Sequence, residues 1–290
     1  MTEHARPVPP LAGRSALVTG GSGGIGSACA AALLKDGASV TLMARHADKL
    51  EQTRQRLQPL VQDGAELRLH AGDAMDKDDV KAAVALAAGV TGRLEICVAT
   101  VGGGAIRPFL LHDEQSFMAE IALNVVPTFL VIRYSAALMA RQGGGSIVCI
   151  SSDSAKLAFP WLPAYTTAKS AIEGMVRALA EELSRYRIRV NAVRPGLTRT
   201  EATSGIFANA ETYRRFAEEK PLGRLGEPED IAAGVRYLAG PESSWVTGQS
   251  FAIEGGNELR KAADLAPLVA QIFGAETFDK ILAGIDPMEA

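Results

Sequence analysis

Short apolar runs alternate along the chain with longer stretches of helical periodicity. The short runs are rich in β-branched and aliphatic residues, and the longer stretches repeat apolar residues every three or four positions. This alternation predicts an α/β fold: a single-domain, Rossmann-like, doubly wound parallel sheet of about seven strands flanked by helices. The predicted strands are residues 15–19, 39–43, 66–71, 95–99, 146–150, 189–193 and 249–253. The predicted helices are residues 25–36, 47–62, 77–88, 116–141, 165–185 and 229–239, with Gly37, Gly64 and Gly89 as C-caps of the first three.

The chain has no internal repeat and no linker rich in Gly, Ser or Pro. We therefore expect one catalytic domain over residues 13–256, an N-terminal extension over 1–12 and a helical C-terminal extension over 257–290. In the C-terminal extension, Asp264 is expected to cap a short helix that ends at Gly274. The apolar stripe of this helix, and that of a second one after it, must be buried either on their own domain or across a subunit interface. The first stripe comprises Leu265, Leu268, Val269, Ile272 and Phe273, and the second Phe278, Ile281 and Leu282.

Composition narrows the function classes. The 290 residues carry 30 Lys and Arg against 33 Asp and Glu, a net charge of -3 that gives no electrostatic footprint for nucleic acid. Cys29, Cys97 and Cys149 lie far apart in apolar runs without metal-ligand spacing, so we expect buried free thiols and no metal site. No signal-peptide core is visible, and charges interrupt the apolar stretches, the longest of which, 121–132 and 157–168, both contain proline. We expect a cytoplasmic protein without membrane or nucleic-acid partners.

A glycine-rich turn, residues 20–26, lies between the first predicted strand and helix. It fits both the Gly21-x-Gly23-x-x-Gly26 spacing and the narrower Thr19-Gly20-x-x-x-Gly24-x-Gly26 spacing. Glycines let the backbone approach a pyrophosphate, whose charge the exposed N–H groups and the helix dipole balance. A tight turn without a ligand needs glycines too, but the position between a strand and a helix favours a dinucleotide site.

Two other patterns supply a phenol, an amine and a hydroxyl group. Tyr165 and Lys169 are four residues apart in a predicted helix, so their side chains share one face. Ser152 follows a predicted strand, at the sheet edge where α/β proteins bind ligands. Taken separately, the first pattern is also that of an exposed Tyr beside a solvated Lys, and the second is also that of a helix cap or a Ser-rich turn. For Ser151 and Ser154 we keep the turn interpretation. The glycine turn favours the catalytic interpretation for the other three.

In this order and spacing, the glycine turn, Ser152, Tyr165 and Lys169 resemble the short-chain dehydrogenase/reductase superfamily, the subgroup with TGxxxGxG and YxxxK motifs. The resemblance runs from about Gly13 to Gly256 and includes Asn124 and the segments 191–200, 221–231 and 246–250. Two features depart from the family pattern. Ala99-Thr100-Val101-Gly102 replaces the usual Asn-Asn-Ala-Gly, which removes side-chain hydrogen bonds expected to brace the fourth strand, and the chain continues beyond Gly256.

The resemblance implies hydride exchange between a nicotinamide coenzyme and a carbonyl or secondary alcohol. Tyr165 would donate the proton in reduction, Ser152 would hold the reacting oxygen, and Lys169 would bind the nicotinamide ribose. Lys169 would also lower the Tyr165 pKa: a shift of roughly 3 units needs about 4 kcal/mol, which an ammonium about 4 Å away supplies at an effective dielectric near 20. Asn124 would hold a water for proton supply, or alternatively bond a carbonyl within its helix. The implied coenzyme contacts are Gly20, Ser22, Gly24, Ile25, Gly26, Arg45, Asp73, Ala74, Gly102, Tyr165, Lys169, Pro195, Gly196, Thr198 and Thr200.

Coenzyme preference depends on the end of the second predicted strand. Ala44 stands where NAD-preferring relatives carry Asp, and the Arg45 guanidinium can pair with a 2′-phosphate. NADP(H) is therefore favoured, with NAD(H) as the alternative. Gly23 argues the other way, because many NADP-preferring relatives carry a basic residue there.

Apolar residues point to the substrate class. A lid over residues 200–219 and the segment between Ser152 and Tyr165 suggest an apolar small-molecule pocket, suited to an apolar ketone, a 3-oxoacyl thioester or a steroid-like ring system. Relatives form dimers and tetramers through their long helices, so the resemblance implies a homo-oligomer, foremost a D₂ tetramer. The rival hypotheses are a cofactor-sensing regulator, which would lack the catalytic residues, an extended-branch epimerase, which has another glycine spacing, and a structural protein, which explains no spacing. The apolar residues are Ile206, Phe207, Tyr213 and Phe216 in the lid, and Phe159, Trp161 and Leu162 before Tyr165.

Overall fold

The computed structural model describes residues 8–260 and 264–288. Within these residues the strands form one parallel seven-stranded sheet in the order β3-β2-β1-β4-β5-β6-β7. The order reverses between β1 and β4, the switch point where open α/β sheets bind ligands. The strands are β1 (Ser15–Thr19), β2 (Ser39–Ala44), β3 (Leu67–Ala71), β4 (Ile96–Ala99), β5 (Gly145–Ile150), β6 (Ile188–Pro195) and β7 (Ser250–Ile253). The predicted fold class is confirmed.

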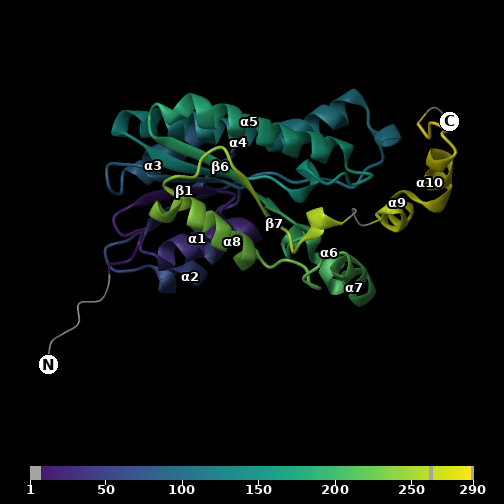
Figure 1. The fold of residues 1–290 in the computed structure, drawn as a ribbon, viewed down its shortest axis with the longest axis horizontal. Helices are drawn as coiled ribbons and strands as arrows, with labels where there is room; N and C mark the ends of the chain where they lie inside the picture. Colours follow the sequence, from purple (N-terminus) through teal and green to yellow (C-terminus); the bar gives the residue numbers. More distant parts are fainter. Residues whose placement is uncertain (1–7, 261–263, 289–290) are drawn as a thin grey trace.

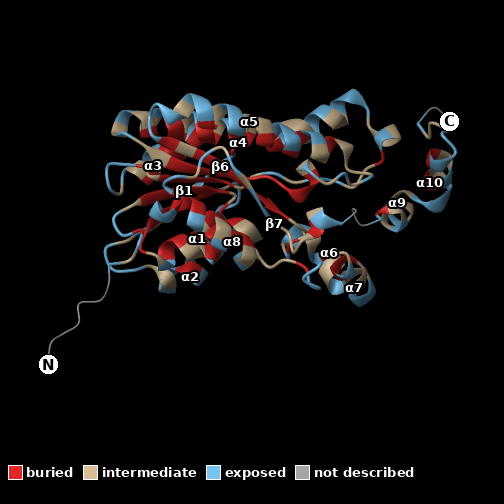
Figure 2. Cartoon of the chain, in the orientation of Figure 1, coloured by how far each residue is buried: buried red, intermediate tan, exposed pale blue. Residues whose placement is uncertain are grey.

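Helices cover both faces of the sheet, as Figure 1 shows. Side chains alternate across each strand, so Val18 and Leu42 pack into one core while Leu17 and Met43 pack into the other. The inner strands β1, β2, β4, β5 and β6 are the most deeply buried part of the molecule (Figure 2), whereas the edge strands β3 and β7 are partly exposed. One core lies under α1 (Gly24–Lys35), α2 (Ala47–Leu57) and α8 (Pro228–Ala239), and the other under α3 (Lys77–Ala88), α4 (Glu114–Gln142) and α5 (Pro163–Ser184).

Four short helices gather at one end of the molecule, away from the N-terminus (Figure 1). They are α6 (Ser204–Ala208), α7 (Ala210–Glu218), α9 (Ala266–Phe273) and α10 (Ala275–Leu282). The two tail helices occur where the apolar stripes predict them, and the Asp264 carboxylate accepts the Ala266 N–H at 2.9 Å. Among the short 3-10 turns, η4 (Glu201–Thr203) precedes α6, and η6 (Asn257–Leu259) begins the C-terminal extension.

The predicted helix 47–62 is wrong at its C-terminal end. The α-helix stops at Leu57, and a 3-10 turn, Gln58–Leu60, follows. Pro59 lacks the N–H that would continue the helical hydrogen bonds. Gly64 consequently lies in a later turn with a φ of 80° instead of capping the helix. Gly37 and Gly89 do lie at the C-terminal ends of α1 and α3.

Helix α4 is the longest helix in the described residues. By length and composition alone it would be able to cross a membrane, with a mean hydropathy of 1.6 in its most apolar window. Arg133 interrupts the apolar stretch of this helix, as the sequence indicates. Val131, Ile132 and Met139 are buried in the core against the sheet, however, which explains the apolar composition of α4.

Part of the predicted N-terminal extension packs on the domain. Leu11 is fully buried, and its N–H donates to the carbonyl of Asp36 at 2.8 Å, so the end of the predicted N-terminal extension packs onto α1. Residues 1–7 of that extension and 261–263 and 289–290 of the tail lie outside the described residues.

The three cysteines are free and buried, as predicted: Cys29, Cys97 and Cys149.

Candidate active site

The glycine turn lies against the start of α1 and is tightly packed. Gly20 has a φ of 65°, and a Cβ there would collide with the Thr100 hydroxyl. A Cβ on Gly26 would collide with the Gly20 carbonyl oxygen. Gly23 caps α1 without a side chain, and no acidic residue lies in the first helical turn. The N–H groups at this helix start therefore suit an anion, and the cradle fits the pyrophosphate of a nicotinamide dinucleotide.

Several of the other predicted coenzyme contacts surround this turn. The Gly21 N–H donates to the Met43 carbonyl at 3.1 Å, which brings the end of β2, and the exposed Arg45 after it, beside the turn. Thr200 packs on the other side, 3.1 Å from where a Gly24 Cβ would be. Half-buried Ser22 and Ile25 belong to the turn itself.

Asp73 and Ala74 follow β3 beside the end of β2, because the Gly72 N–H donates to the Ala44 carbonyl at 3.0 Å. The Asp73 carboxylate accepts the Met75 N–H at 2.9 Å, which makes it a turn-forming side chain. Ala74 is buried. Their place beside β2 agrees with the predicted contact with the adenosine end of the coenzyme.

Thr100 braces the end of β4, which corrects the expectation that replacing Asn-Asn-Ala-Gly removes this support. Its hydroxyl donates to the Thr19 carbonyl at 2.6 Å, so the carboxyl ends of β1 and β4 are still tied together by a side chain. The family motif places amides here, and a single threonine performs the same bracing in this chain.

The catalytic candidates Ser152, Tyr165 and Lys169 meet at the carboxyl end of β5. Ser152 lies two residues after the end of β5 and is buried, and α5 supplies both Tyr165 and the buried Lys169. The Lys169 ammonium lies 5.5 Å from the centre of the Tyr165 ring and donates to the Ile150 carbonyl at 3.0 Å. The four-residue spacing thus brings the phenol and the amine together, as predicted.

The electrostatics of this pair differ from the expectation. Burial raises the pKa of Tyr165 to about 12; the nearby Ser152 hydroxyl opposes this shift, and the charges of Asp153 and Glu120 add to it. Burial also lowers the pKa of Lys169 to about 8. The expected lowering of the Tyr165 pKa by Lys169 is therefore not found in the protein alone, because desolvation is the largest influence on both groups.

Asn124 is fully buried on α4, and its side chain is occupied by backbone partners. Its amide nitrogen donates to the carbonyls of Gly103 at 2.8 Å and Glu120 at 2.9 Å, and its oxygen accepts the Gly103 N–H at 3.1 Å. The alternative of carbonyl bonding is thus the one observed. A Gly102 Cβ would lie 2.5 Å from the Asn124 oxygen and 3.1 Å from the Lys169 nitrogen, so the turn that Asn124 holds passes beside Lys169.

The segment after β6 carries the remaining predicted contacts. Pro195 ends β6, and Gly196 lies so close to Glu254 that a Cβ would come within 2.8 Å of that side chain. The Thr198 hydroxyl donates to the Gly196 carbonyl at 2.8 Å. Thr200 donates its N–H to the Thr203 hydroxyl at 2.9 Å at the start of the lid. This bonding fixes the base of the lid next to the glycine turn.

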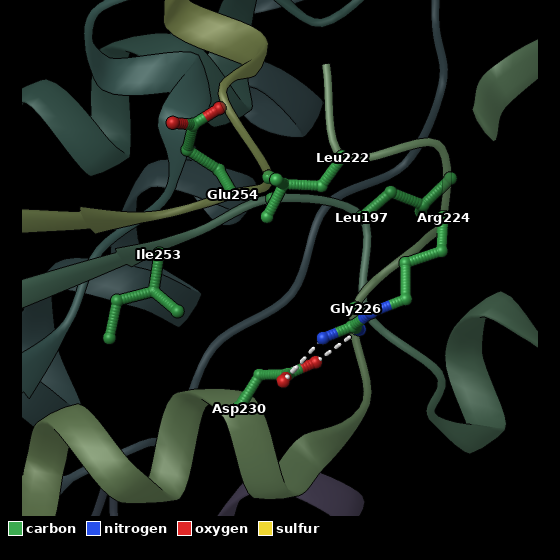
Figure 3. A pocket seen from close by; sticks show the side chains of 9 residues that line it. Leu197, Leu222, Arg224, Gly226, Asp230, Ile253 and Glu254 are labelled. Carbon is green, nitrogen blue, oxygen red and sulfur yellow. Dashed lines mark hydrogen bonds and ion pairs between the residues drawn. The ribbon is translucent and has the colours of Figure 1, made fainter. Parts of the chain in front are cut away.

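Gly196 and Leu197 of this segment line a small hollow of about 100 Å³. Figure 3 shows the side chains around it. Leu197, Leu222 and Glu254 line it, and the ion pair of Arg224 with Asp230, 2.6 Å long, closes one side. Its lining includes neither Ser152 nor Tyr165, and it is smaller than the 300 Å³ or more of typical ligand pockets. We therefore locate the active site by the side chains and not by this hollow.

An apolar cluster joins the lid, the Trp161 segment and the tail. Trp161 has a φ of 71°, a strained value for a bulky residue, and its ring stacks edge-to-face on Phe278 of α10 at 5.5 Å. Phe278 of the tail therefore contacts the segment that precedes Tyr165. The cluster comprises buried Phe216, Ala217, Leu225 and Leu265, surrounded by Ile106, Phe159, Trp161, Leu162, Leu197, Ile206, Phe207, Tyr213 and Leu268.

Sequence reasoning missed two residues at the site. Gly104 lies against the Tyr165 ring, where a Cβ would come within 2.5 Å of Cδ2; its signal was the run of three glycines after Val101. Asp153 is buried and hydrogen-bonded to Ser152; its signal was a carboxylate immediately after a residue predicted to be catalytic.

Comparisons with known proteins identify the family. A family model described as Enoyl-(Acyl carrier protein) reductase matches residues 20–258. The chain is 35% identical over 260 residues to 2,3-dihydroxy-2,3-dihydro-p-cumate dehydrogenase of Pseudomonas putida, covering 89% of this chain and all of that protein. It is 34% identical to glucose 1-dehydrogenase of Gluconobacter oxydans, covering 86% and 93% of the two chains.

Solved structures show the same relationship. A short-chain type dehydrogenase/reductase from Mycobacterium ulcerans has a TM-score of 0.88 at 36% identity and covers 93% of this chain and 98% of its own. A 7α-hydroxysteroid dehydrogenase, complexed with NADH and 7-oxo glycochenodeoxycholic acid, has a TM-score of 0.80 at 30% identity, covering 86% and 97%. The chain belongs to the short-chain dehydrogenase/reductase superfamily and is an NAD(P)-dependent oxidoreductase acting on CH–OH donors.

Proposed function

We propose that the protein is an NADP(H)-dependent oxidoreductase that interconverts an apolar ketone and its secondary alcohol. The observation that carries the proposal is the meeting of Ser152, Tyr165 and Lys169 at one end of the sheet, in the part of the fold where the glycine turn also lies. The apolar cluster includes the segment just before Tyr165 and gives the site its substrate preference.

The side chains divide the proton chemistry among them. Tyr165 donates a proton to the carbonyl oxygen in reduction and takes it back in oxidation. Its raised pKa keeps the phenol protonated near neutral pH, which suits the donor role. Lys169, with a pKa of about 8, carries a proton near neutrality and also serves as a ribose ligand. The bound nicotinamide would supply or accept the hydride. Asn124 contributes by holding the Gly102–Gly103 turn beside Lys169.

A direct test titrates the protein with NADPH and NADH by fluorescence, then measures a panel of ketones and alcohols by nicotinamide absorbance. Tight NADPH binding and turnover of an apolar ketone are expected. Binding of either coenzyme without turnover of any carbonyl or alcohol would contradict the proposal.

The NADP(H) preference rests on Ala44 and Arg45. Replacing both, Ala44→Asp with Arg45→Ala, adds a carboxylate that repels a 2′-phosphate and removes the guanidinium that pairs with it. We expect NADPH affinity to fall about tenfold or more, since a charge-assisted hydrogen bond contributes about 1.5–3 kcal/mol, and the NADH to NADPH ratio of kcat/KM to rise. The control is Arg185→Ala, an exposed arginine after α5 at the opposite end of the strands. A wild-type enzyme that prefers NADH, the coenzyme bound in the hydroxysteroid relative, would contradict the preference.

An apolar ring-bearing ketone is the substrate class that the surroundings favour. Phe159, Trp161 and Leu162 precede Tyr165 on the chain, and lid and tail residues complete the apolar cluster. The hydroxysteroid relative binds a ring ketone and the p-cumate relative acts on a ring diol, according to their names. The glucose dehydrogenase relative acts on a polar sugar, so the panel includes glucose.

A substitution in the tail tests this substrate proposal. Phe278→Ala removes a buried ring that supports Trp161, and the loss of a buried aromatic destabilises local packing by about 3–5 kcal/mol. We expect KM for a ring ketone to rise roughly fivefold, about 1 kcal/mol, while KM for a small ketone such as acetone changes little. Leu282→Ala on the exposed side of the same helix is the matched control. If each ketone has the same KM in Phe278→Ala as in Leu282→Ala, the tail has no role in the pocket.

We further propose a homo-oligomer that uses the exposed side of α4. Met118, Leu123 and Phe129 are exposed large apolar side chains on this helix, a pattern found where a partner covers the surface. Light scattering is expected to give a multiple of the 30.5 kDa chain mass. The single-chain mass would contradict this.

The three free cysteines support a reducing, cytoplasmic location, which cell fractionation tests.

A further inference from the structure

We infer that Asp153 is a positioning residue that sets the direction of the Ser152 hydroxyl proton and thereby controls, with pH, how well Ser152 holds the reacting oxygen. The inference rests on the proposed function. A hydrogen-bond chain that the proposed roles of Ser152 and Tyr165 do not require joins Ser152, Asp153 and Asn257.

Asp153 lies immediately after Ser152 and is only 5% exposed. One carboxylate oxygen accepts the Ser152 hydroxyl proton at 3.1 Å, and the other accepts from the Asn257 amide nitrogen at 3.0 Å. The Ser152 oxygen itself accepts the Ser154 N–H at 3.2 Å. All these groups are buried, so water does not substitute for the bonds.

A serine hydroxyl has one proton to donate. While that proton points at Asp153, Ser152 offers the substrate only an acceptor. A ketone oxygen is also only an acceptor, so it receives no hydrogen bond from Ser152 in that state. The ionised carboxylate therefore weakens the hold of Ser152 on the reacting oxygen. A protonated Asp153 can instead donate to Ser152 and release the serine proton for the ketone oxygen.

The surroundings of Asp153 allow both protonation states. Burial raises its pKa above the usual range, and Glu254 after β7 adds to this. The buried Lys220, which follows α7, and the bonds from Asn257 and Ser152 lower it.

On the side of α5, Asp153 faces Tyr165 and in turn raises the Tyr165 pKa. Groups that raise the pKa and groups that lower it thus surround the Asp153 carboxyl, which lies next to Ser152, the residue proposed to hold the reacting oxygen.

The lid and tail also meet at this carboxyl. Lys220 stands at the end of the lid, and Asn257 begins the tail. Glu258 holds this part of the tail in place through two bonds from Arg194, 2.7 and 3.0 Å long. The position of Asn257, and with it one partner of Asp153, therefore depends on the same segments that form the apolar cluster.

The test is Asp153→Asn. Because Asn257 donates to one side of residue 153, the new amide oxygen belongs there, and the amide nitrogen faces Ser152 as a permanent donor. The variant thus mimics the protonated carboxyl. We expect wild-type ketone reduction to fall with rising pH through an ionisation that Asp153→Asn lacks. At pH values above that ionisation, we expect kcat/KM of the variant for ketone reduction to be about tenfold higher than that of wild type, with kcat/KM for alcohol oxidation rising in proportion because the equilibrium constant fixes their ratio.

Ser154→Ala is the matched control, since it removes a neighbouring hydroxyl that has no hydrogen-bond partner among the described residues and leaves the backbone donor to Ser152. NADPH affinity and Tm are measured for each variant. If Asp153→Asn fails to fold, Asn257→Ala serves instead: loss of that bond raises the Asp153 pKa further and should move the reduction limb to higher pH.

A variant that slows both directions equally and keeps the wild-type pH profile would overturn the inference. A wild-type protein without any carbonyl or alcohol turnover would overturn the proposed function, and the inference with it. The first outcome needs an active wild type, so the two failures are distinguishable.

Discussion

Tyr165→Phe is expected to lower kcat by roughly 10²-fold or more. The substitution removes only the phenol oxygen, the proposed proton donor, and leaves the ring that packs against Gly104 and near Lys169. NADPH affinity should therefore stay within about twofold, which corresponds to less than 0.5 kcal/mol. Turnover is measured by nicotinamide absorbance and affinity by fluorescence titration.

Tyr186→Phe is the control for this prediction, because Tyr186 is exposed and lies beyond the C-terminal end of α5. It should have wild-type kinetics. Near-normal turnover in Tyr165→Phe would show that another group supplies the proton and that the assignment of Tyr165 is wrong.

Gly26→Ala is expected to have the second largest effect, on coenzyme binding. The added methyl would collide with the carbonyl oxygen of Gly20 and would lie 3.1 Å from the Thr100 hydroxyl. Since a backbone oxygen cannot rotate away as a side chain does, the glycine turn must shift. We expect the NADPH dissociation constant to rise at least about tenfold, together with a lower Tm.

Gly23→Ala is the matched variant in the same turn. Its methyl would lie 3.3 Å from the same Gly20 oxygen, and Gly23 is exposed with a φ of -81°, so a small adjustment suffices. Its NADPH affinity should remain close to wild type. Equal losses in the two variants would indicate that the turn tolerates no side chain anywhere, and equal retention would show that it does not hold the pyrophosphate.

Local patterns predicted much of the fold and part of the site. Strand runs such as 15–19 and helices such as 77–88 occur as expected, since their periodicity is a property of neighbouring residues. The Tyr165 and Lys169 spacing brought those two side chains together for the same reason. The end of α2 was missed although Pro59 stood in the sequence, because the apolar period continued past it.

The parts that could not be predicted depend on contacts between distant segments. Thr100 braces Thr19 from 81 residues away, and Asn257 bonds Asp153 from 104 residues away. No periodicity or short motif in the sequence indicates that these two pairs of residues are in contact. Residue type alone says that an amide can bond a carboxylate, but not that the fold will bring the two together.

By itself, the sequence determined the order of strands and helices, the glycine turn and the set of groups available for proton transfer, because backbone conformation and periodic burial follow from residues close in the chain. Only the tertiary structure decided how those groups behave. It buried Tyr165 and Lys169 enough that desolvation controls both pKa values, and it placed Asp153 behind Ser152. It also packed the tail against Trp161. Desolvation and long-range packing depend on everything that surrounds a side chain, and that environment exists only once the chain has folded.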